Sequence, residues 1–186
     1  MSSTKPKGVD TVFLSLVITL VTLGFLIFSS ASLGLLARSG ASFGSVAFSQ
    51  FVFGIVGGGA ALFILSNVHY RNWRKYAIYI FAIGLIGTLA VFIPGIGMTH
   101  AGATRWINLG ITTVQPSEFL KIAYVIYLAT WLSGMHKHVE NWRYGLIPFG
   151  IISAITGTVM LLQPDTDTFL IMATAGLAMF VVAGAR

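Results

Sequence analysis

The sequence contains no cysteine and few charges, and both deficits narrow the class of protein. Without cysteine there is no disulfide bond, no thiolate catalysis and no Cys-ligated zinc. Only 9% of the 186 residues are charged, whereas soluble domains carry about a quarter. Asp and Glu number 5 against 11 Lys and Arg, which gives a net charge of +6. The composition therefore excludes a soluble enzyme, a disordered tail and a secreted disulfide scaffold.

Long apolar runs take up most of the chain, and 56% of the residues are hydrophobic. The positive charges lie in short clusters between these runs and not in the basic patch of a nucleic-acid-binding domain, so we expect no nucleic-acid partner. A spanning helix needs roughly 20 mostly apolar residues. The first run is too long for a signal peptide, so we expect it to be retained. We predict an all-α, polytopic transmembrane bundle with six spanning helices, at about residues 11–36, 43–66, 76–93, 116–133, 144–162 and 168–185.

The distribution of basic residues predicts the orientation, because Lys and Arg accumulate in cytoplasmic loops. A cytoplasmic N-terminal tail, residues 1–10, leaves only Arg38 and Arg105 on the outer side, while Lys121 falls within the fourth helix. We therefore predict a multi-pass membrane protein with its N-terminus in the cytoplasm. The basic residues on the inner side are then Lys5, Lys7, Arg71, Arg74, Lys75, Lys137, Arg143 and Arg186.

The outer loop over residues 94–115 is long for a membrane hairpin, and loops beyond about 12–15 residues are often functional. Pro116 suits the first turn of the fourth helix, because no hydrogen-bond donor is needed there. Glu118 falls in the same turn, where the helix dipole favours an anion. Lys121 lies three residues further on and on the same side. Charges within a membrane helix usually face a partner or a water-filled cavity, and both an ion pair and a polar cavity remain open.

The sixth helix has a similar start, Gln163-Pro164-Asp165, also on the outer side. Asp165 or Thr166 is a candidate N-cap. Two helix N-termini with Arg105 nearby would suit an anionic ligand such as a phosphate. The carboxylates oppose such a ligand unless a divalent cation lies between them and it. No residue set predicts a resident metal site.

These two helix starts carry a resemblance to a known family. Arg105-Trp106-Ile107-Asn108-Leu109-Gly110, running into Gln115-Pro116-Ser117-Glu118-Phe119-Leu120-Lys121, resembles the signature of the SEDS family (shape, elongation, division and sporulation). Gln163-Pro164-Asp165 is similar to the family's second signature. The resemblance covers the chain from Asp10 onward, and residues 102–107 are closer to the division branch than to the elongation branch.

The resemblance implies a peptidoglycan glycosyltransferase that polymerises lipid II, an undecaprenyl-pyrophosphate-linked disaccharide-peptide, during cell division. The reaction would take place at the outer face of the bacterial cytoplasmic membrane. It implies a class B penicillin-binding protein and divisome proteins as partners, and no recognisable cofactor. Alternative functions are a lipid-linked precursor flippase or transporter, and a non-catalytic scaffold for a penicillin-binding protein. The implied substrate-cavity residues are Arg105, Trp106, Gln115, Ser117, Glu118, Lys121 and Asp165.

The sequence departs from the family pattern in two respects. Asp167 stands in place of the family's glycine, and aspartate would be the poorer residue if that glycine supplies a positive φ. The resemblance implies about ten spanning helices in the complete family members. Their essential aspartate lies in an outer loop after the seventh, which would fall beyond Arg186. We therefore expect the chain to be an N-terminal portion that lacks the catalytic residue and is inactive alone.

Overall fold

The computed structural model describes residues 10–39, 50–100, 102–109, 113–135 and 138–184. The chain divides into two units, Met1–Val68 and His69–Arg186. Each predicted apolar stretch is helical over most of its described residues; the exceptions lie at the ends of the stretches and are Ile93, Tyr144, Gly145, Ala183 and Gly184. The predicted tail up to residue 9 and the start of the second predicted helix, residues 43–49, lie outside the described residues.

The first unit consists of α1 (Thr11–Ser39), the π-helical segment η1 (Gln50–Val56) and α3 (Gly57–Ser66). The rings of Phe25 on α1 and Phe51 on η1 meet edge to face, with their centroids 6.4 Å apart. Apolar side chains along both helices are exposed within the chain, for example Leu20 at 70% and Phe63 at 73%. A surface this apolar is suited to lipid and not to water.

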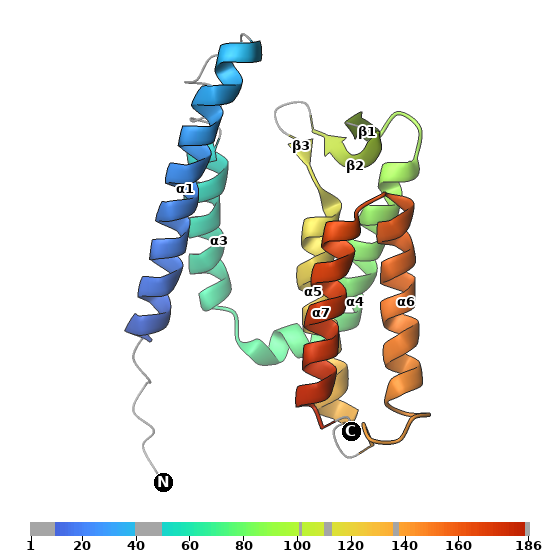
Figure 1. Ribbon diagram of the computed structural model, residues 1–186. Helices are drawn as coiled ribbons and strands as arrows, with labels where there is room; N and C mark the ends of the chain where they lie inside the picture. The colour runs from blue at the N-terminus through green and yellow to red at the C-terminus, as the bar shows by residue number, and fades with distance from the viewer. Residues whose placement is uncertain (1–9, 40–49, 101, 110–112, 136–137, 185–186) are drawn as a thin grey trace. The chain divides into compact units, whose positions relative to one another are not determined.

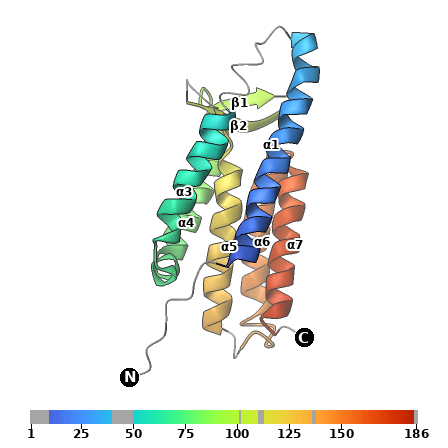
Figure 2. The ribbon, with the colours of Figure 1, turned by 90° about the vertical axis from the view of Figure 1, so that its left-hand side faces the viewer.

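The second unit is a bundle of four helices: α4 (Tyr70–Leu89), α5 (Pro116–Met135), α6 (Leu146–Leu162) and α7 (Thr166–Val182). A 3₁₀ turn, η2 (Ala90–Phe92), follows α4. Helix α5 packs against both α4 and α7, and α7 also packs against α6 (Figure 1). The turn between α6 and α7 and the segment between α4 and α5 therefore lie at the same end of this bundle, as both views show (Figures 1 and 2).

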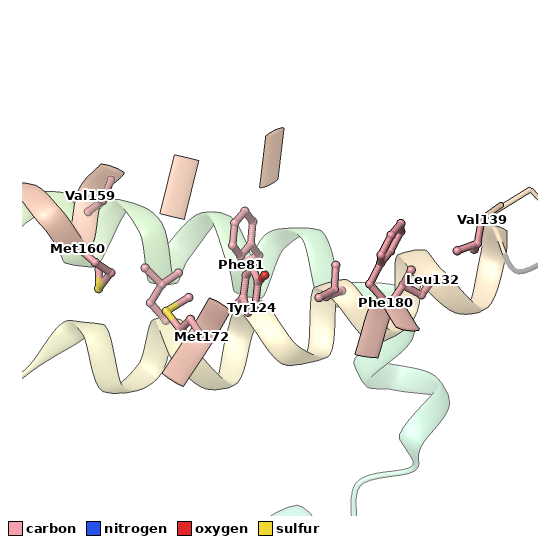
Figure 3. Close-up of a cluster of buried hydrophobic side chains, with 10 residues drawn as sticks. Phe81, Tyr124, Leu132, Val139, Val159, Met160, Met172 and Phe180 are labelled. Carbon is pink, nitrogen blue, oxygen red and sulfur yellow. The ribbon is translucent and has the colours of Figure 1, made fainter. Parts of the chain in front are cut away.

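The core of the second unit is built around α5. Tyr124, Leu120 and Leu128 are buried on its inner face, and Phe81 from α4 lies beside Tyr124 (Figure 3). Gly176 on α7 allows a close approach, since a Cβ there would collide with the Tyr124 hydroxyl. Deleting a methyl group or adding one at such a contact is costly in a close-packed interior.

The segment between α4 and α5 forms a small sheet, although we predicted a loop in an all-α fold. Strands β1 (Gly97–His100), β2 (Ala103–Asn108) and β3 (Thr113–Val114) pair antiparallel in the order β1-β2-β3. The β1–β2 connection contains Gly102 at φ +81°, a conformation that glycine adopts without strain. The strands are only two to six residues long, so the sequence contains no long apolar run that would indicate them.

Two helical stretches of the described residues are long and apolar enough to cross a membrane by themselves, Thr11–Ser30 and Arg71–Phe92. Gly54–Ser66, Leu146–Leu162 and Thr166–Val182 are shorter apolar helices. The fold is thus mostly helical and consistent with a polytopic membrane bundle, with a small sheet at one end of its second unit.

Candidate functional site

A bulge in the small sheet positions Arg105. Met98 pairs with Trp106 and Thr99 pairs with Thr104, so Arg105 is the extra residue on β2 between the two pairs. A bulge bends its strand and changes the direction of a side chain. The Arg105 side chain reaches the turn between α6 and α7, which is about 60 residues further along the chain.

The Arg105 guanidinium binds three acceptors in that turn. Its Nε donates to the backbone oxygen of Gln163 at 3.2 Å, and its Nη2 donates to the backbone oxygen of Pro164. Its Nη1 lies 3.5 Å from Oδ1 of Asp165 and forms an ion pair with it. The planar fork of arginine suits such a set of acceptors, whereas lysine would provide only a point charge. We considered an anionic ligand near Arg105, but three of its nitrogens already bind protein oxygens.

Asp165 connects three elements through one buried carboxylate. Its Oδ1 accepts a hydrogen bond from the backbone N–H of Thr168 at 3.4 Å, so Asp165 is the N-cap of α7 and Thr166, the other candidate, is the first helical residue. Its Oδ2 accepts a bond from Nε2 of Gln115, the residue before α5, at 3.2 Å. The ion pair between Asp165 and Arg105 connects the third element, the small sheet. We call these three residues, Arg105, Gln115 and Asp165, the polar clamp.

Gln163 extends the polar clamp to α4 and is a residue that our site prediction missed. It is buried, and its Nε2 donates to the backbone oxygen of Thr88 near the end of α4 at 2.8 Å. Gln163 was visible in the sequence as the first residue of the Gln-Pro-Asp signature. Thr88 lies inside an apolar run and had no comparable signal. Within the described residues, Oε1 of Gln163 and Oγ of Ser117 are buried without a hydrogen-bond partner.

Glu118 and Lys121 form an ion pair on the first turns of α5, as their spacing predicted. Nζ of Lys121 lies 2.7 Å from Oε1 of Glu118. The Glu118 side chain is 56% exposed and that of Lys121 is 23% exposed within the chain. Ser117, one residue earlier, is fully buried, whereas Trp106 on β2 is 37% exposed. The Glu118–Lys121 pair therefore faces away from the core of the helix bundle.

Five of the seven predicted site residues thus fall into two groups at one end of the second unit, and Trp106 and Ser117 belong to neither group. The polar clamp is self-compensated, because the charge of Asp165 meets that of Arg105. The Glu118–Lys121 pair is more exposed, and Glu118 is three residues after the clamp residue Gln115 along the chain. The backbone N–H of Glu118 donates to the backbone oxygen of Gln115 at 3.1 Å, but within the described residues no side-chain hydrogen bond or ion pair joins the two groups. The clamp is suited to holding backbone in place, and the pair is suited to meeting a polar ligand.

The fold and these two groups define a helical membrane protein with an ordered polar end. The sequence matches the family model described as "Cell cycle protein", which unites FtsW, RodA and SpoVE, over residues 10–186. The match covers nearly the whole chain, so the chain belongs to this family, the SEDS family of integral membrane proteins. The predicted membership of the SEDS family is confirmed.

Individual relatives agree with this assignment. "Probable peptidoglycan glycosyltransferase FtsW" of Burkholderia thailandensis is 36% identical over 124 residues, 67% of this chain and 27% of that protein. The crystal structure of the rod shape determining protein RodA of Thermus thermophilus is similar at a TM-score of 0.77 and 26% identity, covering 95% of this chain and 54% of that chain.

A further solved structure is described as "Structural coordination of polymerization and crosslinking by a peptidoglycan synthase complex". It matches at a TM-score of 0.75 and 26% identity, over 94% of this chain and 48% of that chain. The chain therefore spans about half the length of the two solved relatives.

Proposed function

We propose that the protein is a peptidoglycan glycosyltransferase that polymerises lipid II at the outer face of the cytoplasmic membrane during cell division. Membership of the family and the relative named as a peptidoglycan glycosyltransferase support the reaction class. The solved complex that coordinates polymerisation and cross-linking supports a cross-linking partner. We assign that role to a class B penicillin-binding protein, with divisome proteins as further partners.

The observation that carries the proposal is the polar clamp beside the Glu118–Lys121 pair. The clamp holds the sheet, the start of α5 and the start of α7 together through Asp165. The pair is thereby presented at a fixed position at the outer end of the bundle. In the proposed cavity, Glu118 and Lys121 contact the polar part of lipid II, and the clamp keeps the wall in place.

The remaining predicted residues have supporting roles in this proposal. Trp106 on β2 is 37% exposed, and we assign its ring to the wall of the proposed cavity. Ser117, the residue before Glu118, is buried, and its hydroxyl lacks a partner within the described residues. We place both in the outer wall with Arg105 and Gln115.

Polymerisation of purified lipid II by the protein as its gene encodes it, supplied with a divalent cation and its cross-linking partner, tests the proposal. We expect Glu118→Gln and Lys121→Met each to lower turnover on the order of a hundredfold, the size typical of a lost electrostatic contact in a reaction centre. The matched control is Asp167→Asn, since Asp167 is an exposed carboxylate in the first turn of α7. If the three variants lose activity equally, or none does, the pair does not belong to the cavity.

The proposed topology has a separate test. We propose that the sheet faces the outside and that the turn between α5 and α6 faces the cytoplasm, as the basic residues predict. Single cysteines at Thr99 and His138 can be exposed to an impermeant thiol reagent in intact cells. We expect labelling at position 99 only; labelling at position 138 alone would invert the orientation.

A further inference from the structure

A groove lined by basic residues lies at the end of the second unit opposite the sheet. Arg71, Arg74 and Lys75 on α4 line it together with Thr130 on α5, and its volume is about 620 Å³. The three cations are spaced i, i+3 and i+4, so they share one face of α4. Helix α4 runs from this groove to η2 and the sheet, so the groove and the polar clamp are at opposite ends of α4 (Figure 1).

The positive charge in the groove is uncompensated by the described part of the protein. In the described part, Arg105 pairs with Asp165 and Lys121 pairs with Glu118, and neither ion pair involves a residue of the groove. Lys75 has a cation–π contact with the ring of Tyr76, at 5.4 Å from its centroid. The first turn of α4 contains no acidic residue, and the positive end of the helix dipole lies there. Three cations at this end raise the local potential further, which favours an anion.

The position of the groove along α4 indicates which anion. Arg71–Phe92 is long and apolar enough to cross a membrane, and the cations lie in its first turns. They are thus at the boundary between the apolar core and the headgroup region. The side chains that follow on α4, Ile78 at 49% and Tyr79 at 64%, are exposed and can lie against acyl chains. A phosphate at this depth is most naturally part of a lipid headgroup.

We propose that this groove binds the phosphodiester headgroup of an anionic phospholipid. Arg71, Arg74 and Lys75 meet the phosphate oxygens, and the Thr130 hydroxyl from α5 donates a further hydrogen bond. The groove volume is within the range of small-ligand sites. Basic pockets at the cytoplasmic ends of membrane helices are suited to such headgroups. The bound lipid would link α4 to α5 at the end opposite the clamp. This proposal is independent of the glycosyltransferase proposal, because it concerns neither lipid II nor the outer face.

Lipid binding by the protein as its gene encodes it tests the proposal. Protein delipidated in an uncharged detergent is titrated with dioleoyl phosphatidylglycerol, dioleoyl phosphatidylcholine or inorganic phosphate, and bound molecules are counted by native mass spectrometry. We expect one tight phosphatidylglycerol and no comparable phosphatidylcholine. Each groove cation contributes roughly fivefold to the affinity, so Arg71→Gln/Arg74→Gln/Lys75→Gln weakens the tight site roughly a hundredfold. Thr130→Val, which keeps every charge, weakens it a fewfold.

The matched control, Lys5→Gln/Lys7→Gln/Arg143→Gln, removes the same charge from the predicted cytoplasmic side at residues other than Arg71, Arg74 and Lys75. We expect it to keep the tight site within about threefold of the unmodified protein. Equal weakening by the two triple variants would mean attraction by net charge alone and would overturn the proposal. Binding of inorganic phosphate as tightly as phosphatidylglycerol would overturn the lipid assignment. A monodisperse elution profile for every variant excludes misfolding as the cause.

Discussion

Asp165→Ala and Asp165→Asn separate the charge of Asp165 from its role as a helix cap. Alanine removes both, whereas asparagine keeps the cap, because Asn and Asp are about equally good N-caps. In the structure the carboxylate accepts hydrogen bonds from Thr168 at 3.4 Å and Gln115 at 3.2 Å, and it pairs with Arg105 at 3.5 Å. We therefore expect both variants to destabilise the second unit, and alanine to do so more strongly.

The contacts set the magnitude of the effect. Loss of an N-cap costs about 1 kcal/mol, and a hydrogen bond to a charged group contributes about 1.5–3 kcal/mol. Removing one partner of a buried ion pair costs about 3–5 kcal/mol. The lower end applies here, because the Arg105 side chain is 29% exposed and keeps two backbone acceptors. These contributions overlap, so we expect about 4 kcal/mol for Asp165→Ala and about 2–3 kcal/mol for Asp165→Asn.

Thermal unfolding in detergent measures the difference. In domains of this size 1 kcal/mol corresponds to about 2–4 °C, so Asp165→Ala should lower the midpoint by roughly 10 °C. Arg105→Lys should resemble Asp165→Asn, because a lysine keeps the charge but cannot reach three acceptors. Asp167→Asn is the control and should change the midpoint by less than about 3 °C. If Asp165→Ala unfolds with the midpoint of Asp167→Asn, the polar clamp does not hold the three elements together.

Two further perturbations concern α5. An exposed i,i+3 pair contributes only about 0.5 kcal/mol, so Glu118→Gln, Lys121→Met and the double variant should all unfold within about 2 °C of the unmodified protein. A much lower midpoint in either single variant than in the double variant would instead indicate a buried pair. Gly176→Ala should cost about 1–3 kcal/mol through its collision with the Tyr124 hydroxyl, and Tyr124→Phe should restore part of this loss, since two ring carbons stay 3.1 and 3.2 Å from the added Cβ. Gly150→Ala on α6 meets no atom within 4 Å and is the control; a similar loss in both glycine variants would contradict the packing argument.

Features that depend on neighbouring residues could be predicted from the sequence. Pro116 is the first residue of α5, and Asp165 caps α7. Glu118 and Lys121 make contact because residues three apart share a helix face. In each case the relevant residues lie within a single helical turn. The period of the helix then determines which side chains meet, whatever the rest of the chain does.

The polar clamp could not be predicted in this way, because its members are far apart along the chain. Arg105 and Asp165 are separated by 60 residues, and Gln163 and Thr88 by 75. The family resemblance placed Arg105, Gln115 and Asp165 in one site but did not pair them. Their pairing depends on a bulge that adds one residue to β2 and redirects its side chain. Apolar periodicity contains no information on where such a bulge forms.

Asp167 shows how local geometry decides whether a departure from a family pattern matters. Glycine is favoured where φ is positive, but position 167 is the second residue of α7 and is not among the residues with positive φ. Its side chain is exposed and places a carboxylate in the first turn, where the positive end of the helix dipole lies. Aspartate is therefore compatible with this turn and adds to the stabilisation that the Asp165 cap provides. In this segment the structure requires a specific residue at position 165, because the Asp165 carboxylate is buried among three partners. Position 167, on the exposed surface of the helix, has no such requirement.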